Sequence, residues 1–244
     1  MAELHDEKLF KDPPPNEECP ICMLPLPPDT GQSVFMSCCG KVCCNGCIYS
    51  MKMRTKGIDI CAFCRTPYSF SGKEEVGRIK KLINKGNEGA FYYLAGVYSR
   101  GVLGVPQDHK QANELWLKGG ELGCAYAYNS LGKSYYNGRG VEVDTNKGQY
   151  YWELAAMGGD LMARYNLGVA EGKSGNFHRS KKHFVIAARA GYSIALGNVK
   201  QGFIDGEVSK DEYATTLRAY QRSINEMKSD ERDKAALAKA QGEF

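Results

Sequence analysis

The sequence lacks any run of about 18 apolar residues, the length that a helix needs to cross a bilayer. Its first residues, MAELHDEKLFKD, are charged and contain no apolar stretch like that of a secretory signal peptide. Cysteine is almost confined to residues 19–64, and Cys124 is the only one outside this segment. These absences predict a protein without a membrane span in a reducing compartment, the cytoplasm or the nucleus.

An excess of charge of one sign is also absent, because 32 Lys and Arg residues face 28 Asp and Glu residues, a net charge of +4. The cysteine-rich segment is locally basic (Lys41, Lys52, Arg54, Lys56 and Arg65). It lacks the interleaved aromatic residues on which single-stranded nucleic acid stacks. No paired-carboxylate or Ser-His-Asp pattern stands out. We therefore expect no membrane, no nucleic acid and no catalytic side chains.

Nine of the ten cysteines lie between Cys19 and Cys64. Three C-x2-C pairs begin at Cys19, Cys44 and Cys61, and the doublet Cys38-Cys39 lies between the first two. Two thiolates at this spacing can reach one ion from a tight turn, so the pattern predicts two tetrahedral Zn²⁺ sites. Metal binding can add on the order of 10 kcal/mol of folding free energy to so small a module. A disulfide framework is the alternative, and it requires an oxidising compartment.

The cysteine spacing resembles that of the RING finger family, whose four ligand pairs interleave around two zinc ions. The resemblance implies one set made of Cys19, Cys22, Cys44 and Cys47, and a second made of Cys38, Cys39, Cys61 and Cys64. Lys41 stands where the usual RING histidine would be, so the closer likeness is to the all-cysteine RING of the CCR-NOT-complex ubiquitin ligase. Cys43 is an alternative ligand to Cys38 or Cys39.

RING modules hold a ubiquitin-conjugating enzyme near a substrate and contribute positioning rather than covalent chemistry. The resemblance implies that Ile21, Met51 and Pro67 form an apolar groove for that enzyme, and that Arg65 bridges the enzyme and ubiquitin. Ala62 departs from the proline that is usual in the fourth pair. Two plainer interpretations stay open: Ile21 packs the zinc loops, and Arg65 is a solvated charge.

From residue 88 the sequence repeats variants of the phrase Ala-x3-Leu-Gly-x2-Tyr about every 36 residues. Copies begin at Ala90, Ala127 and Ala163, and an eroded fourth copy begins at Ala195. Glycine turns separate two helical stretches in the first two copies, and the second stretch carries Trp116 or Trp152. The pattern resembles the Sel-1-like repeat, a tetratricopeptide-related solenoid. The resemblance implies a surface that binds protein segments.

The remaining segments frame these two domains. Residues 1–16, charged and then proline-rich, are expected to form a flexible lead-in. The other boundaries are 17–70 for the zinc module, 71–87 for a linking and capping helix, 88–207 for the repeats, and 208–244 for a capping helix and tail. The tail is expected to be solvated and frayed from Ser229. His178 and His183 lie on a charged helical stretch without a nearby acidic pair, and we expect both to be solvated.

The sequence therefore predicts a mainly α protein. A small cross-brace zinc module, with short strands and one helix beginning near Asn45, precedes an all-α solenoid of helical hairpins. The predicted function is that of a RING-type ubiquitin ligase, a transferase that recruits a conjugating enzyme through the RING and a protein substrate through the repeats. The alternative is a non-enzymatic adaptor or scaffold stabilised by zinc. The substrate, the conjugating enzyme, the ubiquitin linkage and the oligomeric state do not follow from the sequence.

Overall fold

The computed structural model describes residues 2–69 and 71–242 of the 244-residue chain. The chain forms two compact units, each built from segments that are distant in sequence. The first unit contains residues 1–15 and 120–225, and the second contains residues 16–119 and 226–244. In the described residues, no helix has both the length and the apolar character to span a bilayer. The predicted domain boundary at residue 70 lies outside the described residues.

The second unit begins with the cysteine-rich segment. A short 3-10 helix, η1 (Thr30–Gln32), leads into strand β1 (Ser33–Met36), which pairs antiparallel with β2 (Lys41–Cys44). Helix α2 (Asn45–Arg54) follows β2 directly. The short strands and the single helix agree with the sequence-based prediction. Cysteines make up much of the two small buried clusters of this segment, so little of its core is aliphatic.

Helices α3 (Gly72–Ile83), α4 (Glu88–Arg100) and most of α5 (His109–Glu121) complete the central part of the second unit. Val76 and Ile79 of α3 are buried in one cluster with Leu94 of α4, so the predicted helix after the zinc module packs on the first repeat. Phe35 of β1 joins the same cluster, and its ring stacks on that of Tyr93 with a centroid distance of 4.1 Å. The cysteine-rich segment and the first helical hairpin therefore share one core.

Asn87 joins the start of α4 to the cysteine-rich segment. Its Oδ1 accepts a hydrogen bond from the backbone nitrogen of Ala90 at 2.9 Å, and its Nδ2 donates to the carbonyl of Gly40 at 3.4 Å. Gly40 has a φ of +72°, and an added Cβ would lie 2.8 Å from Asn87 Nδ2. Glycine alone supplies both the left-handed backbone and the space at this position.

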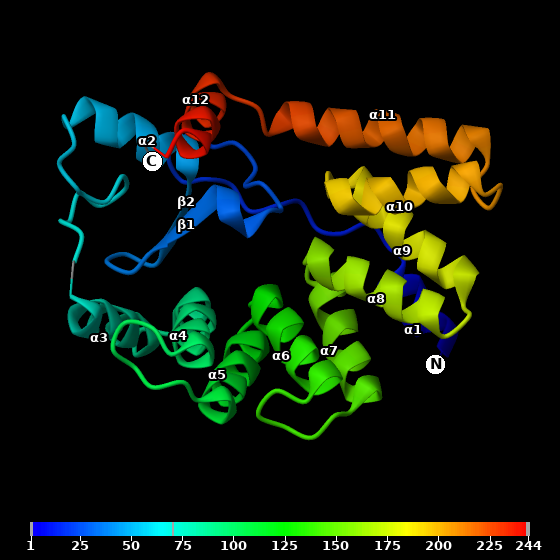
Figure 1. The fold of residues 1–244 in the computed structure, drawn as a ribbon, viewed down its shortest axis with the longest axis horizontal. Coiled ribbons are helices and arrows are strands. Elements are labelled where there is room, and N and C mark those ends of the chain that lie inside the picture. The colour runs from blue at the N-terminus through cyan, green and yellow to red at the C-terminus, as the bar shows by residue number, and fades with distance from the viewer. Residues whose placement is uncertain (1, 70, 243–244) are drawn as a thin grey trace. The chain divides into compact units, whose positions relative to one another are not determined.

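The C-terminal helix α12 (Asp230–Ala240) packs against α2 within the second unit (Figure 1). The sequence predicts a frayed tail from Ser229, and here the structure differs. Ser229 caps the helix by accepting a hydrogen bond from the backbone nitrogen of Arg232, and the small side chains of Ala235 and Ala238 are buried. An added Cβ at Gly46 would lie 2.7 Å from Arg232 N, so glycine permits this close approach.

The first unit is built from successive helices packed as hairpins: α6 (Ala125–Asn137), α7 (Thr145–Met157), α8 (Leu161–Lys173), α9 (Phe177–Arg189), α10 (Ser193–Ile204) and α11 (Lys210–Glu226). The repeated glycine and tryptophan meet in its core. An added Cβ at Gly132 would lie 2.5 Å from Cδ1 of Trp152. The indole Nε1 donates to the carbonyl of Asn129 at 3.2 Å. Glycine thus makes room for the aromatic side chain of the neighbouring helix.

Residues 1–16 are predicted to be a flexible lead-in, and the structure differs here too. Residues Ala2–Leu9 form helix α1, which packs against α7 in the first unit. Leu9 is fully buried beside Trp152, and Pro14 lies against Gly159. The prediction was wrong because it was based on the charges and prolines of this segment. Its few apolar side chains pack on a surface that lies far away in the sequence.

The prediction for the two histidines of α9 is half wrong. His178 is exposed, as expected, but His183 is fully buried. Phe10 covers it, with a distance of 4.8 Å between the two ring centroids. A charged neighbourhood in the sequence therefore did not imply a solvated side chain.

Candidate metal centre

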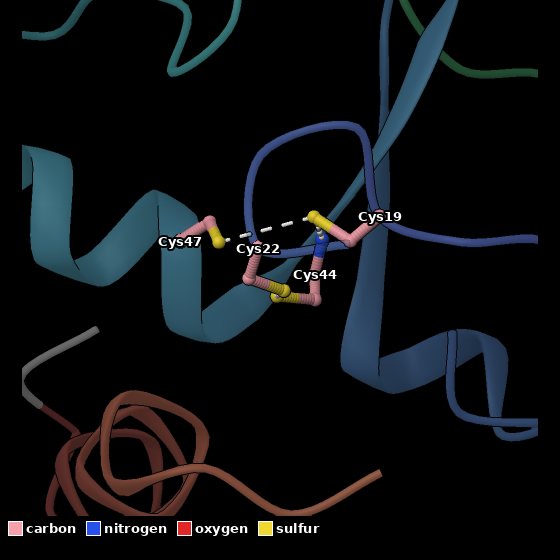
Figure 2. Close-up of side chains that lie close together, drawn as sticks. All are labelled: Cys19, Cys22, Cys44 and Cys47. Carbon is pink, nitrogen blue, oxygen red and sulfur yellow. Dashed lines mark hydrogen bonds between the residues drawn. The ribbon is translucent and has the colours of Figure 1, made fainter. Parts of the chain in front are cut away.

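The eight predicted cysteine ligands come together in two groups of four. One group contains Cys19, Cys22, Cys44 and Cys47, and the other contains Cys38, Cys39, Cys61 and Cys64. Within each group all four Sγ atoms lie within 4.8 Å of one another. Figure 2 shows the first group, in which two cysteines come from the loop before η1 and two from the junction of β2 and α2.

The sulfur spacing in both groups fits a tetrahedral ion. Four thiolates at 2.3 Å from zinc in tetrahedral geometry lie about 3.8 Å from one another. The Sγ–Sγ distances are 3.8 Å for Cys19–Cys47, 3.8 Å for Cys22–Cys44, 3.9 Å for Cys39–Cys61 and 3.4 Å for Cys38–Cys64. All ten cysteines are unbridged. The arrangement therefore favours metal ligation over the disulfide framework that the sequence left open.

The backbone after each cysteine pair shows how the thiols are aimed. The residue that follows the second cysteine is left-handed in three places, at Met23, Gly40 and Arg65, with φ angles of 58°, 72° and 65°. The backbone nitrogen of Met23 donates to the carbonyl of Cys19 at 2.9 Å, and that of Arg65 donates to the carbonyl of Cys61 at 3.0 Å. Each of these turns directs two thiols to the same side of the chain.

The adjacent cysteines Cys38 and Cys39 reach one group because the chain bends sharply after them. The backbone nitrogen of Gly40 donates to the carbonyl of Met36 at 2.7 Å, which closes this bend. Cys43 lies outside both groups and is fully buried in the cluster of Met36 and Cys61. The positions of the sulfur atoms therefore favour the doublet over Cys43 as a source of ligands.

The gathered thiols provide a donor set that suits a soft divalent cation. Burial raises the pKa of Cys39 to about 11 and that of Cys47 to about 12, so these groups resist ionisation in the absence of a counter-charge. A divalent ion would supply that charge and stabilise the thiolates. Four thiolates in tetrahedral array match the preference of zinc and exclude the oxygen-loving Mg²⁺ and Ca²⁺.

The four predicted partner-binding residues all reach the surface to some degree. Ile21 is 39 % exposed, Arg65 and Pro67 are exposed, and Met51 is half-buried. The structure brings two of them together, since the guanidinium of Arg65 contacts the sulfur of Met51. Pro67 pairs with Ile60 in an isolated antiparallel bridge. Ile21 stands on the separate turn between the first two cysteines.

One residue of this centre was missed by sequence reasoning. The guanidinium of Arg232, on α12, donates to the carbonyls of Leu24, Pro25 and Met227 at 3.3, 2.8 and 2.7 Å, and to the sulfur of Cys22 at 3.6 Å. A cation beside a metal-bound thiolate orients it and stabilises its charge. No spacing rule links Arg232 to the cysteines, so only the folded chain reveals the contact.

Comparison with protein families bears on the helical hairpins. The Sel1 repeat model matches residues 90–124, 125–160 and 161–192. This chain carries Sel1 repeats. The three matched copies coincide with the helix pairs α4–α5, α6–α7 and α8–α9, which confirms the predicted repeat type. The eroded fourth copy from Ala195 and the cysteine-rich segment lie outside the matched residues.

A curated relative shares part of this sequence. The chain is 32 % identical over 112 residues to the ERAD-associated E3 ubiquitin-protein ligase component HRD3B of Arabidopsis thaliana. The match covers 41 % of this chain and only 18 % of the length of HRD3B.

Two solved structures share the fold. A Sel1 repeat protein from Oxalobacter formigenes has a TM-score of 0.56 at 19 % identity, over 73 % of this chain and 72 % of that one. A protective antigen of uropathogenic Escherichia coli strains, described as displaying an SLR fold, has a TM-score of 0.55 at 22 % identity, over 73 % and 40 %. At these identities the likeness establishes the fold of helical hairpins and no activity.

Proposed function

We propose that this protein is a zinc-dependent RING-type ubiquitin ligase that binds a conjugating enzyme through residues 17–70 and a protein substrate through its Sel1 repeats. One observation carries the proposal: two interleaved groups of four thiols, each with the spacing of a tetrahedral zinc site. Interleaving holds the first cysteine turn, the central helix and the last cysteine turn together as one platform. Such a platform is suited to docking another protein.

The two cysteine groups would hold one zinc ion each. Because each group offers four thiols, no coordination position stays open for substrate, and the zinc would contribute folding free energy rather than chemistry. The module would act by positioning a charged conjugating enzyme beside an acceptor lysine. Thiol-ligated zinc also suits a reducing compartment, the cytoplasm or the nucleus.

The exposed residues beside these groups supply the docking surface in the proposal. Ile21, Met51 and Pro67 would offer apolar contacts to the conjugating enzyme. Arg65 would bridge the enzyme and ubiquitin with its guanidinium, whose contact with Met51 keeps it next to the apolar residues. The left-handed backbone at Arg65 sets the direction of that side chain.

The Sel1 repeats support the other half of the proposal. Repeats of this solenoid class offer extended surfaces to protein partners. HRD3B, which shares part of the sequence, is by its name a component of an E3 ubiquitin-protein ligase. The shared core of Phe35 and Tyr93 builds the cysteine-rich segment directly onto the first repeat. A substrate bound to the repeats and a conjugating enzyme bound to the cysteine-rich segment would thus be held on the same chain.

The test is self-ubiquitination of the full chain in vitro with a panel of ubiquitin-conjugating enzymes. Wild type is compared with Ile21→Ala and Arg65→Ala, and with the matched exposed controls Val34→Ala and Arg54→Ala. Zinc content is measured for every sample. We expect ubiquitin chains with wild type and both controls, and at least a tenfold loss of rate with Ile21→Ala and with Arg65→Ala.

The rival function is a non-enzymatic adaptor, and the packing of α12 on α2 favours it. That contact covers one face of the helix on which Met51 lies and leaves less of it for an enzyme. Two bound zinc ions without activity across the whole panel would reject the ligase and support the adaptor. Equal activity in all five proteins would reject the proposed docking residues.

A further inference from the structure

The first unit holds a segment of its own chain against its Sel1 repeats. Helix α1 lies beside α7, α8 and α9, although it comes from outside the residues that match the repeat family (Figure 1). Phe10, which follows α1, contacts His183 of α9. Leu9 is fully buried in the apolar cluster that contains Trp152 and Leu167. We call the residues that contact this segment the α1 site: Trp152, Glu153, Arg164, Leu167, Arg179, Lys182 and His183.

The α1 site selects an acidic side chain at one position. Nη1 of Arg179 donates to Oδ2 of Asp6 at 2.6 Å, and the pKa of that carboxyl is lowered by this hydrogen bond. Arg179 is itself held in place, because its Nε donates to Oε1 of Glu171 at 2.6 Å. A pre-positioned guanidinium loses less conformational entropy on binding an acid. The next acid, Glu7, is exposed.

The site also binds the end of a short helix through Arg164. This guanidinium is only 1 % exposed, and it donates to the carbonyl of Leu9 at 2.6 Å and to that of Ala156 at 3.0 Å. Buried guanidinium groups are costly unless they are hydrogen-bonded, and one of these two acceptors belongs to the bound segment. The carbonyls in the last turn of a helix carry partial negative charge, which complements the arginine.

A third feature selects an aromatic side chain. The ring of Phe10 lies 4.8 Å from that of His183, with Arg179 and Lys182 at 4.9 and 5.2 Å from its centroid. Cations at such distances are attracted to an aromatic ring. Among the described residues, neither ring nitrogen of His183 nor Nε of Arg164 has a hydrogen-bond partner. The segment therefore leaves buried polar atoms unsatisfied and is an imperfect occupant.

We propose that the α1 site is the partner-binding face of the repeats, and that it recognises a short helix with the pattern Asp-x-x-Leu-Phe. The chain's own residues 6–10 have this pattern and act as an internal pseudo-ligand that a partner protein displaces. This deepens the proposed function, because it names the binding face and the partner chemistry. It rests only on the part of that proposal that gives the repeats a protein partner, and it does not depend on ligase activity.

The experiment measures binding of a fluorescein-labelled peptide of residues 1–16 to the full chain by fluorescence anisotropy. In wild type the linked segment competes at an effective concentration on the order of millimolar. The variant Asp6→Ala/Leu9→Ala/Phe10→Ala removes the side chains that occupy the α1 site, and we call it the emptied chain. We expect it to bind the peptide at least tenfold more tightly than wild type does. Glu7→Ala is the matched control and should behave as wild type.

Peptide variants test the chemistry of the site. Peptides with Asp6→Ala or Phe10→Ala should bind the emptied chain at least tenfold more weakly, and the Glu7→Ala peptide should bind equally well. If the emptied chain fails to fold, a protease site inserted between Pro15 and Asn16 allows wild-type protein to be cut after folding, and exchange with labelled peptide is then measured.

Several outcomes would overturn the proposal. A folded or cut chain that binds no peptide, or that binds the Asp6→Ala peptide as tightly as the original, would show that α1 is only a structural element. A concentration-dependent dimer of wild type that the emptied chain cannot form would assign the site to the N-terminus of a second copy instead. None of these three results depends on ubiquitin transfer, so failure here is distinct from failure of the ligase test.

Discussion

The guanidinium of Arg232 donates to the sulfur of Cys22 at 3.6 Å, and thereby connects α12 with the first group of cysteines. The same side chain donates to the carbonyls of Leu24 and Pro25 in the turn that follows this cysteine. Arginine is suited to this task because its planar fork carries several donors that remain charged. The C-terminal helix is thus part of the candidate metal centre.

Replacing Arg232 with alanine should weaken the first cysteine group. The turn after Cys22 would lose its donors, at a cost of about 2 kcal/mol for hydrogen bonds to a charged group. We expect one of two zinc ions to pass to a chromogenic chelator several-fold faster than in wild type. Lys234→Ala, at an exposed position on the same helix, is the control. Equal release from Arg232→Ala and wild type would show that α12 does not support the metal.

The neighbours Cys43 and Cys44 should differ sharply in their effect on metal content. Cys44 belongs to the first cysteine group, whereas Cys43 lies outside both groups. We expect Cys43→Ser to retain two zinc ions and Cys44→Ser to retain one, as measured by native mass spectrometry. If Cys43→Ser lost an ion while Cys38→Ser or Cys39→Ser kept both, Cys43 would replace that residue as a ligand.

Gly132→Ala should destabilise the first unit by about 1–3 kcal/mol, because the new methyl group collides with the ring of Trp152. Gly197 is the matched control in α10, since an added Cβ there meets nothing within 4 Å. Gly197→Ala should stabilise the unit by about 0.5–1 kcal/mol through helix propensity. Urea unfolding followed by Trp152 fluorescence, in a Trp116→Phe background, distinguishes the two. Similar shifts for both variants would contradict this account of the repeated glycine.

His183 should make the stability of the first unit depend on pH. Burial, with Arg164 and Arg179 nearby, lowers the pKa of His183 to about 3 from its usual 6.5. Below pH 6.5 His183 is protonated in the unfolded chain but stays neutral in the folded chain. Because of this residue, the free energy of unfolding decreases as the pH falls toward 3. Between pH 7 and pH 5 the loss from His183 amounts to about 2 kcal/mol.

The measurement compares urea unfolding at pH 7 and pH 5 in wild type, His183→Phe and the exposed control His178→Ala. His183→Phe should lose about 2 kcal/mol less than the other two proteins on acidification. The comparison is made between variants because burial raises the pKa of Asp160 to about 6, an effect of opposite sign. Parallel losses in all three proteins would mean that His183 is protonated in the folded state.

Local spacing was enough to predict the C-x2-C pairs and the helical repeats, whereas the resemblances to known families supplied the grouping of the cysteines and the type of repeat. Cysteines such as Cys19 and Cys22 lie three residues apart, a spacing at which one turn aims both thiols to the same side, so the sequence carries this geometry directly. The phrase around Gly132 and Gly168 works in the same way, since an added Cβ at either glycine would meet an aromatic ring of the next helix. The choice between Cys43 and the doublet could not be made from spacing, because it depends on the bend at Gly40.

By itself, the sequence determined the three C-x2-C pairs and the repeated helical hairpins, because both depend on residues close together along the chain. The tertiary structure alone decided what becomes of the two ends of the chain. The carbonyl of Leu9 accepts a hydrogen bond from Arg164, and Arg232 donates one to the sulfur of Cys22. In both pairs the two residues are separated by most of the sequence. Short charged segments bury too little apolar surface to order themselves, so their structure is set by the surfaces that receive them.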